Sequence, residues 1–201
     1  MKLYYSPGAC SLSPHIVLRE AGQTFDMEQV DLGTKKTKSG ADFSKINPKG
    51  YVPALQLDSG EVLTEGPAIV QYIADKAPGA KLAPANGSLE RYKLQEWLNF
   101  TTSEMHKSMG GLFNDKMPAE AKQIVKDGLA KRLAYLDEHL GKNDFIMGKE
   151  FSVVDAYLFT VLGWGKWVGV DVEAFPNVKA YLGRVGSRPK VQEALKAEGL
   201  A

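Results

Sequence analysis

Residues 4–15 read YYSPGACSLSPH, and this stretch joins the end of a short apolar strand to a turn and a helix start. Ser-Pro-Gly at 6–8 breaks the strand, because proline lacks an N–H group and glycine favours turns. Cys10 therefore lies near the first turn of a helix expected over 11–21. The unpaired N–H groups and the macrodipole of that turn stabilise a thiolate, so we expect the pKa of Cys10 to be lowered. The alternative is a small, buried and unreactive cysteine.

The composition is that of an ordinary folded protein of one or two domains, with 201 residues, 44% of them hydrophobic and 24% charged. The formal net charge of +1 and the lack of a dense basic block argue against nucleic acid as a partner. No signal peptide and no run of about 18 apolar residues is evident, so we expect neither secretion nor a membrane span.

Cysteine and histidine usage restricts the chemistry further. A single cysteine cannot form an internal disulfide, which fits a reducing, cytoplasmic location and leaves the thiol free to react. The three histidines, His15, His106 and His139, lie far apart in the sequence and none is paired with a cysteine at ligand spacing. We therefore expect no metal.

The first 77 residues alternate short strands with helices. Apolar runs, turn residues and 3.6-residue periods mark a βαβ unit followed by a hairpin and a helix. Thr64 is placed to cap that last helix, with Pro67 in its first turn. The order βαβ then ββα is a thioredoxin-like layout. The expected strands are 2–5, 25–30, 52–57 and 61–64, and the expected helices are 11–21, 41–46 and 65–76.

The remainder of the chain predicts a second, all-helical domain. Prolines and glycines crowd residues 78–87, which we interpret as a linker, so that 1–77 forms one domain and 88–201 the other. The stretch 153–164 is apolar almost all round, as expected of a helix buried centrally among others. Ser152 and Asp155 form a capping-box pattern at its start, a structural role. The other expected helices carry the apolar periods of 94–105 and 125–140 or cover 177–185 and 189–197.

Two short motifs in the first domain suggest a ligand site. In residues 47–53, NPKGYVP, Pro53 leaves an exposed backbone edge at Val52. A proline at this place in a thioredoxin-like layout is typically cis, which would turn the Val52 N–H and C=O toward Cys10 so that an extended peptide pairs with them. Glu65 and Gly66 offer a carboxylate for an ammonium and N–H groups for a carboxylate. The alternatives are an ordinary turn and a charge that only compensates the helix dipole.

A polar stripe marks the first helix of the second domain. Asn99, Ser103 and His106 are spaced i, i+4 and i+7, so all three should project from one helix face and could border a cleft. Glu104 and Lys107 flank this stripe. The alternative is a solvated helix face with an idle histidine.

Taken together, these motifs resemble those of a bacterial beta-class glutathione S-transferase, and the resemblance covers the full chain. The stretches ACSLSPH and NGSLERY are especially similar to members associated with biphenyl and related aromatic catabolism. The resemblance implies a thioredoxin-like domain, a helical domain and a homodimer that binds one glutathione per subunit. The residues that carry it are 4–10, Val52 and Pro53, 64–66, His106 and Lys107, and 152–155.

The resemblance also implies roles around the glutathione sulfur. It places Cys10 against that sulfur, with which it can form a mixed disulfide, and His106 reaching toward the same atom from the helical domain. It pairs the Val52 backbone with the cysteinyl part of glutathione, next to a cis Pro53, and brings Lys35 to the glycyl carboxylate.

Further implied contacts involve the γ-glutamyl end of glutathione and the second substrate. Glu65 and Gly66 hold the γ-glutamyl end; serine is usual at position 66 in the wider superfamily, so only the Gly66 N–H can serve here. Ser103 of the partner subunit and Glu104 of the partner subunit complete that end. The remaining implied glutathione-binding residues are Tyr51, Asn99 and Lys107, and Trp164 and Tyr157 are candidates for the hydrophobic-substrate pocket, with core packing as the alternative for Tyr157.

Three functions follow as hypotheses. The first is a detoxifying transferase that joins the glutathione thiol to a hydrophobic electrophile, by displacing halide or by adding to an activated double bond. The second is a monothiol disulfide oxidoreductase in which Cys10 is the nucleophile, without a second cysteine in the CSLS motif. The third is a carrier or assembly module without catalysis. The sequence does not identify the electrophile, because hydrophobic pockets discriminate weakly.

Overall fold

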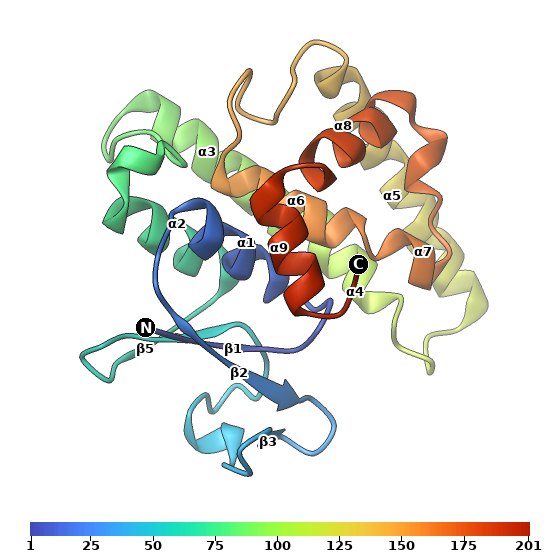
Figure 1. Ribbon diagram of the computed structural model, residues 1–201. Coiled ribbons are helices and arrows are strands. Elements are labelled where there is room, and N and C mark those ends of the chain that lie inside the picture. Colours follow the sequence, from blue (N-terminus) through green and yellow to red (C-terminus); the bar gives the residue numbers. More distant parts are fainter. The chain divides into compact units, whose positions relative to one another are not determined.

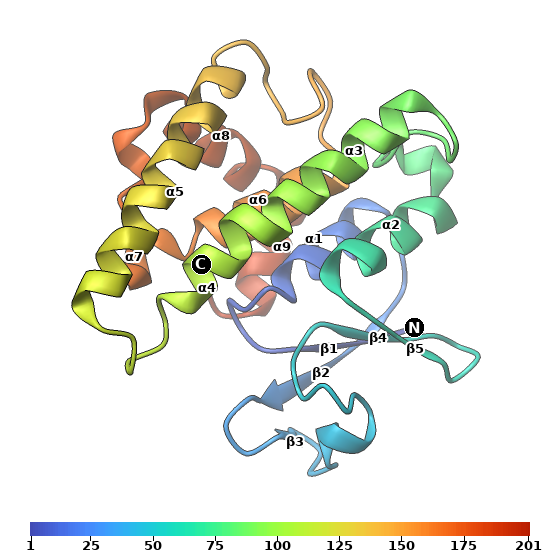
Figure 2. The same ribbon diagram turned by 180° about the vertical axis from the view of Figure 1, so that it is seen from behind.

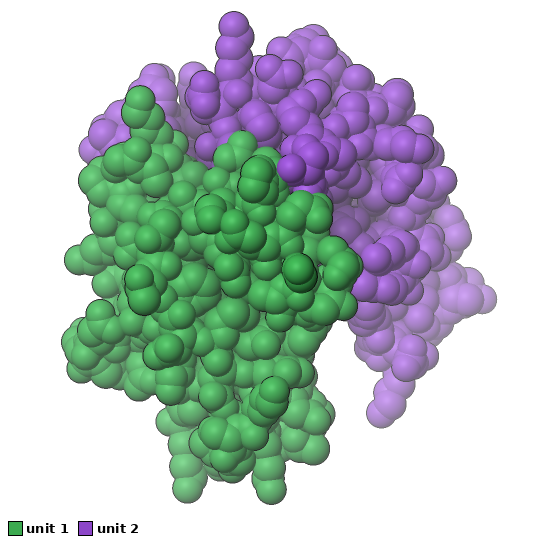
Figure 3. Space-filling view, in the orientation of Figure 1, with its two compact units in different colours: residues 1–83, 188–201 green, residues 84–187 purple.

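The computed structural model describes residues 1–201, and the contacts within the chain group them into two compact units (Figure 3). Unit 1 comprises residues 1–83 and 188–201, and unit 2 comprises 84–187. The sequence placed 88–201 in one helical domain, whereas these contacts group residues 188–201 with unit 1. The physical reason is the attachment of the last helix to the first one, described below.

Unit 1 contains a five-stranded sheet of order β3-β2-β1-β4-β5. Strand β1 pairs with β2 in parallel and with β4 in antiparallel orientation, and β5 continues the sheet beyond β4. This is the predicted thioredoxin-like layout. The edge strand β3 was not predicted, and a short 3-10 helix, η1, stands where a helix over 41–46 was expected. The bounds are β1 Lys2–Tyr5, β2 Asp26–Asp31, β3 Lys36–Thr37, η1 Phe43–Lys45, β4 Ala54–Gln56 and β5 Val62–Thr64.

Three helices complete unit 1: α1 (Leu12–Glu20), α2 (Gly66–Lys76) and α9 (Pro189–Ala197). Helix α1 packs against both α2 and α9 on the same side of the sheet (Figures 1 and 2). Just beyond α9, the buried carboxylate of Glu198 accepts a hydrogen bond from the Gly8 N–H at 3.0 Å and lies 2.8 Å from Nδ1 of His15. These contacts explain why the end of the chain belongs with the first unit.

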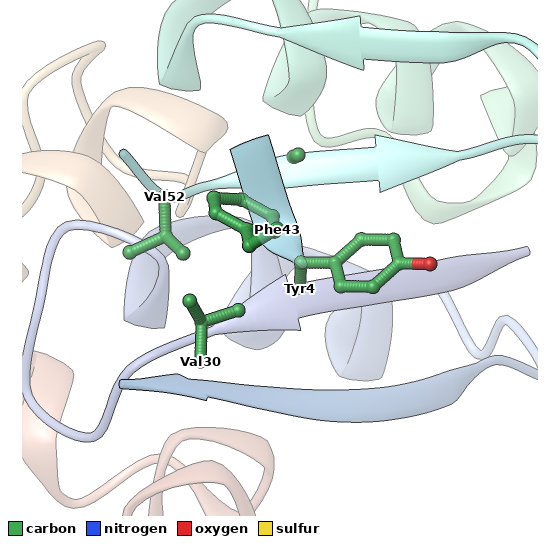
Figure 4. Close-up of a cluster of buried hydrophobic side chains, with 5 residues drawn as sticks. Tyr4, Val30, Phe43 and Val52 are labelled. Carbon is green, nitrogen blue, oxygen red and sulfur yellow. The ribbon is translucent and has the colours of Figure 1, made fainter. Parts of the chain in front are cut away.

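The opposite face of the sheet carries a small apolar core (Figure 4). Successive strand side chains alternate between faces, so Tyr5 contacts the His15 ring of α1 while Tyr4 packs against Phe43. Val52 joins this cluster with only 2% of its surface exposed. Its side chain therefore anchors the loop that precedes β4. The cluster consists of Tyr4, Val30, Phe43, Val52 and Ala54.

Unit 2 is helical, and its apolar helix α6 packs against α3, η3 and α8. The central position predicted for this stretch is confirmed. Helix α7, after it, was not predicted, and α6 ends before Trp164. None of the helices in the structure combines the length and apolar character that crossing a bilayer requires. The bounds are α3 Leu89–Phe100, the π-helix η3 Thr101–His106, α4 Lys107–Gly111, α5 Ala119–Leu140, α6 Val153–Leu162, α7 Gly165–Val168, the 3-10 turn η4 Val172–Ala174 and α8 Pro176–Gly186. A further 3-10 turn, η2 (Pro78–Ala80), belongs to unit 1.

The predicted capping box at the start of α6 is confirmed, with Ser152 and Asp155 bonded reciprocally. The fully buried Asp155 carboxylate accepts hydrogen bonds from the N–H groups of Ile146 and Ser152, each at 2.8 Å, and from the Tyr181 hydroxyl at 3.2 Å. Burial still raises the pKa of Asp155, although these donors oppose the shift. The carboxylate thus joins the loop before α6 to helices α6 and α8.

We predict that Asp155→Ala lowers the free energy of unfolding by about 3 kcal/mol. The variant loses the helix cap and leaves buried N–H groups without an acceptor, each of which costs about 1–3 kcal/mol. Denaturant titration measures the loss. Asp127→Ala, at an exposed position of α5, is the matched control and should change stability by less than about 0.5 kcal/mol. Equal stabilities of the two variants would contradict the role given to Asp155.

Candidate functional site

The Cys10 thiol is held by the loop that precedes β4. Its sulfur donates a hydrogen bond to the Val52 carbonyl oxygen at 3.1 Å, and the Val52-Pro53 peptide bond is cis, as predicted. The Val52 N–H donates no hydrogen bond to another group of the protein. The backbone at Val52 therefore faces the Cys10 loop with its carbonyl and keeps a donor for an extended ligand.

The pKa of Cys10 differs from the expectation. Burial of the sulfur raises this pKa to about 12, and the negative charge of Glu65 adds to the increase. The backbone N–H groups of Cys10 and Ser11 lower it, as the helix-start argument predicted, but by less than desolvation raises it. The Val52 carbonyl also requires a protonated sulfur as its donor. The protein by itself thus favours the neutral thiol.

Lys35 lies beside the same loop. Its ammonium donates to the Gly50 carbonyl oxygen at 2.8 Å, and its backbone has a φ of 58°. Only three non-glycine residues have positive φ, and Lys35 and Glu65 are two of them. Such conformations cost free energy and concentrate at functional sites. The two charged residues predicted to bind the ends of the ligand thus share an uncommon backbone geometry.

Glu65 precedes α2 with φ 69° and ψ 112° and forms no side-chain cap. Its carboxylate forms an ion pair with Lys49 and accepts a hydrogen bond from the Tyr51 hydroxyl at 2.8 Å. The hydrogen bonds to Glu65 raise the pKa of Lys49 and the pKa of Tyr51. Thr64, expected to cap the helix, ends strand β5 instead. The carboxylate is thus paired with the ammonium of Lys49, a residue that the sequence did not indicate.

Gly66 has room for the side chain that the wider family carries. A Cβ at this position would lie 4.0 Å from Pro53 Cγ and 4.0 Å from the Ser13 hydroxyl, which is ordinary contact. Within the loop of residues 49–53, Lys49 and Tyr51 bond to Glu65, and Gly50 bonds to Lys35. Val52 bonds to Cys10, and Pro53 lies beside Gly66. One five-residue loop connects every candidate residue of unit 1.

In unit 2, His106 packs into an aromatic setting. Its Nδ1 atom lies 2.6 Å from the Tyr157 hydroxyl, and its ring contacts the Trp164 ring edge-on at 4.9 Å between centroids. Tyr157 and Trp164 are 2% and 6% exposed, so both are largely covered. The ring of Phe113, which sequence reasoning missed, lies 6.1 Å from Trp164 and is half exposed.

The structure separates His106 from the stripe predicted for the helix face. Asn99 and Ser103 are exposed, and the Ser103 hydroxyl donates to the Asn99 carbonyl oxygen at 3.0 Å, whereas His106 is half-buried. The reason is the π-helix over Thr101–His106, whose wider turns shift side chains around the axis relative to an α-helix. Stretches of π-helix occur frequently at functional sites.

Glu104 is held by a residue that the sequence did not indicate. Arg132 of α5 donates from Nε and from one terminal nitrogen to the same carboxylate oxygen, at 3.0 and 2.8 Å. The other carboxylate oxygen lies 3.3 Å from the Ser103 hydroxyl. Lys107 is exposed. Arg132 therefore orients Glu104 beside Ser103, the pair predicted to act together.

Family models match both parts of the chain. Residues 8–76 match the glutathione S-transferase N-terminal domain and residues 100–189 the C-terminal domain. The ternary complex of BphK, a bacterial GST, is 58% identical with a TM-score of 0.97. A sphingomonad glutathione S-transferase complexed with glutathione is 52% identical, and a bacterial beta-class glutathione S-transferase of Sphingomonas chungbukensis is 53% identical, each with a TM-score of 0.96. All three alignments cover 100% of both chains.

The chain belongs to the glutathione S-transferase family, as the resemblance predicted. The similar solved structures include a bacterial member and a bacterial beta-class member. The family matches, the thioredoxin-like sheet and the helical second unit together show that the protein is an enzyme of the glutathione transferase type.

We predict that Cys10 reacts slowly with iodoacetamide in native, glutathione-free enzyme. With a pKa of about 12, little thiolate is present near pH 8, whereas a denatured thiol has its ordinary pKa of about 8.5. Labelling followed by mass spectrometry should be at least about a hundredfold slower in native than in urea-denatured protein at pH 8. The native rate should keep rising with pH beyond 10. A native thiol that reacts faster than the denatured one would contradict the raised pKa.

Proposed function

We propose that this enzyme conjugates the glutathione thiol to hydrophobic electrophiles, with displacement of halide as one form of the reaction. The observation that carries the proposal is the single loop of residues 49–53, which joins an ammonium at Lys35, a carboxylate at Glu65 and the backbone beside Cys10. Glutathione carries complementary groups: a carboxylate at its glycyl end, an ammonium at its γ-glutamyl end and a peptide backbone between them. The relative complexed with glutathione supports this assignment.

The protonation state of Cys10 favours conjugation over disulfide exchange. A disulfide oxidoreductase needs the protein thiolate as nucleophile, and burial raises the pKa of Cys10 to about 12. In conjugation the nucleophile is the glutathione sulfur, so a neutral Cys10 is no obstacle. The carbonyl at Val52 and the Cys10 thiol would then border the glutathione sulfur without reacting.

His106 is proposed as the group that stabilises the glutathione thiolate. An imidazole N–H aimed at sulfur lowers the free energy of the anion, and Trp164, Tyr157 and Phe113 supply an apolar surrounding in which such a bond is strengthened. Asn99 and Lys107 are proposed to line the same site. We propose further that the enzyme is a cytoplasmic homodimer, in which Ser103 of the partner subunit and Glu104 of the partner subunit complete the γ-glutamyl end.

Glutathione should raise the thermal midpoint of the purified enzyme. A ligand that binds only the native state at a hundred times its Kd adds about 2.7 kcal/mol, which is a shift of about 5 °C or more for a chain of this size. Glu65→Gln should weaken glutathione binding about tenfold by removing the partner of the ammonium. Glu61→Gln changes an exposed carboxylate at the other end of β5, is the matched control and should bind normally. No shift with millimolar glutathione would contradict the site.

Cys10→Ala and His106→Ala should separate conjugation from disulfide exchange. We expect Cys10→Ala to retain measurable conjugation of an aryl halide and to lose disulfide exchange with oxidised glutathione, because only the second reaction needs the protein thiol. His106→Ala should lower kcat/KM for conjugation about ten- to a thousandfold, the usual effect of a lost charge-stabilising donor. Complete loss of conjugation in a Cys10→Ala variant that still binds glutathione would overturn this division of roles. A panel of chlorinated aromatics, epoxides and mixed disulfides would then identify the second substrate.

A further inference from the structure

The hydrogen bond between His106 and Tyr157 can run in only one of two directions. The hydroxyl oxygen lies 2.6 Å from Nδ1, so either Tyr157 donates its proton to Nδ1 or a protonated Nδ1 donates to the oxygen. Each direction fixes a different tautomer of a neutral imidazole. The tautomer in turn decides whether Nε2 is a donor or an acceptor for any other group.

The chemistry of the two partners favours donation by Tyr157. A phenol is a better donor than acceptor, because its oxygen lone pair is delocalised into the ring, and an unprotonated imidazole nitrogen is a good acceptor. The neighbouring Thr102 hydroxyl is 3.5 Å from the Tyr157 oxygen, but its single proton is directed to the Leu98 carbonyl oxygen at 2.9 Å. Of these two neighbours, His106 is therefore the closer hydrogen-bond partner of the Tyr157 hydroxyl.

Packing restricts the imidazole ring to this arrangement. The His106 ring meets the Tyr157 ring at an interplanar angle of 73° and the Trp164 ring at 76°, with centroid distances of 5.7 and 4.9 Å. Tyr157 lies on the central helix α6 and is only 2% exposed, so its hydroxyl has a defined position. Two edge-on aromatic neighbours therefore restrict the rotation of this half-buried ring.

We propose that Tyr157 is a positioning residue that donates to Nδ1 of His106 and holds the imidazole as the Nε2–H tautomer. The proposal rests on the proposed function and deepens it. With its proton on Nε2, a neutral His106 stabilises the glutathione thiolate as a hydrogen-bond donor and does not act as the base. The S–H bond of glutathione then breaks with transfer of its proton to water, and the sulfur keeps the electron pair with which it attacks the electrophile.

The tautomer can be measured on ligand-free enzyme by ¹⁵N NMR of histidine-labelled protein. The His106 signals are those missing from the His106→Ala spectrum. In the wild type we expect a protonated Nε2 and an unprotonated Nδ1, and Tyr157→Phe should shift both nitrogens toward the average of two tautomers. Tyr135→Phe removes a hydroxyl from an exposed position of α5 and is the matched control, expected to leave the His106 signals unchanged. A wild-type spectrum with protonated Nδ1 would overturn the proposal.

Conjugation kinetics test the consequence. Tyr157→Phe should lower kcat/KM about tenfold, as for outer residues that orient a functional histidine, and should have no further effect in the His106→Ala background. Equal losses in both backgrounds would show that Tyr157 acts on its own, as substrate-pocket lining or core, and would overturn its positioning role. If His106→Ala conjugates at full rate, the proposed function of His106 fails, while the NMR spectrum still decides the direction of the hydrogen bond.

Discussion

The burial of the Val52 side chain is the constraint on which the rest of unit 1 depends. This valine is packed with Tyr4, Val30 and Phe43 beneath the sheet, so the backbone on either side of it has little freedom. Its carbonyl oxygen accepts the hydrogen bond of the Cys10 thiol, and the peptide bond to Pro53 that follows is cis. The packing of Val52 in the core thereby places its carbonyl oxygen beside Cys10, just before the start of α1.

The same loop connects groups of opposite charge that lie far apart in the sequence. Lys35 reaches the Gly50 carbonyl, and Glu65 accepts from Tyr51, so an ammonium and a carboxylate are both within reach of one extended segment. Each of the two residues has a positive φ, a conformation that the surrounding contacts must maintain.

Much of this arrangement could be predicted from the sequence because it depends on local rules. The break at 6–8, the prolines at 48 and 53 and the capping pattern at 152–155 each have a short-range physical cause, and the structure contains all the elements that they mark. The roles proposed for residues such as Lys35 and Tyr51 come from the family resemblance, because no local rule indicates them. The unpredicted features depend on long-range contacts: Arg132 of α5 holds Glu104 of η3, and Lys49 pairs with Glu65 on the far side of the β4–β5 hairpin.

The sequence by itself determined the thioredoxin-like order of strands and helices, the apolar central helix and the position of Cys10 before α1, because periodicity and turn residues act over a few residues. Only the tertiary structure decided the protonation of Cys10, since desolvation depends on which chain segments cover the sulfur and outweighs the local N–H groups. It also decided the surroundings of His106. The α-helical period of the sequence does not reveal the π-helix over Thr101–His106, and this histidine contacts Tyr157 and Trp164 in the folded chain.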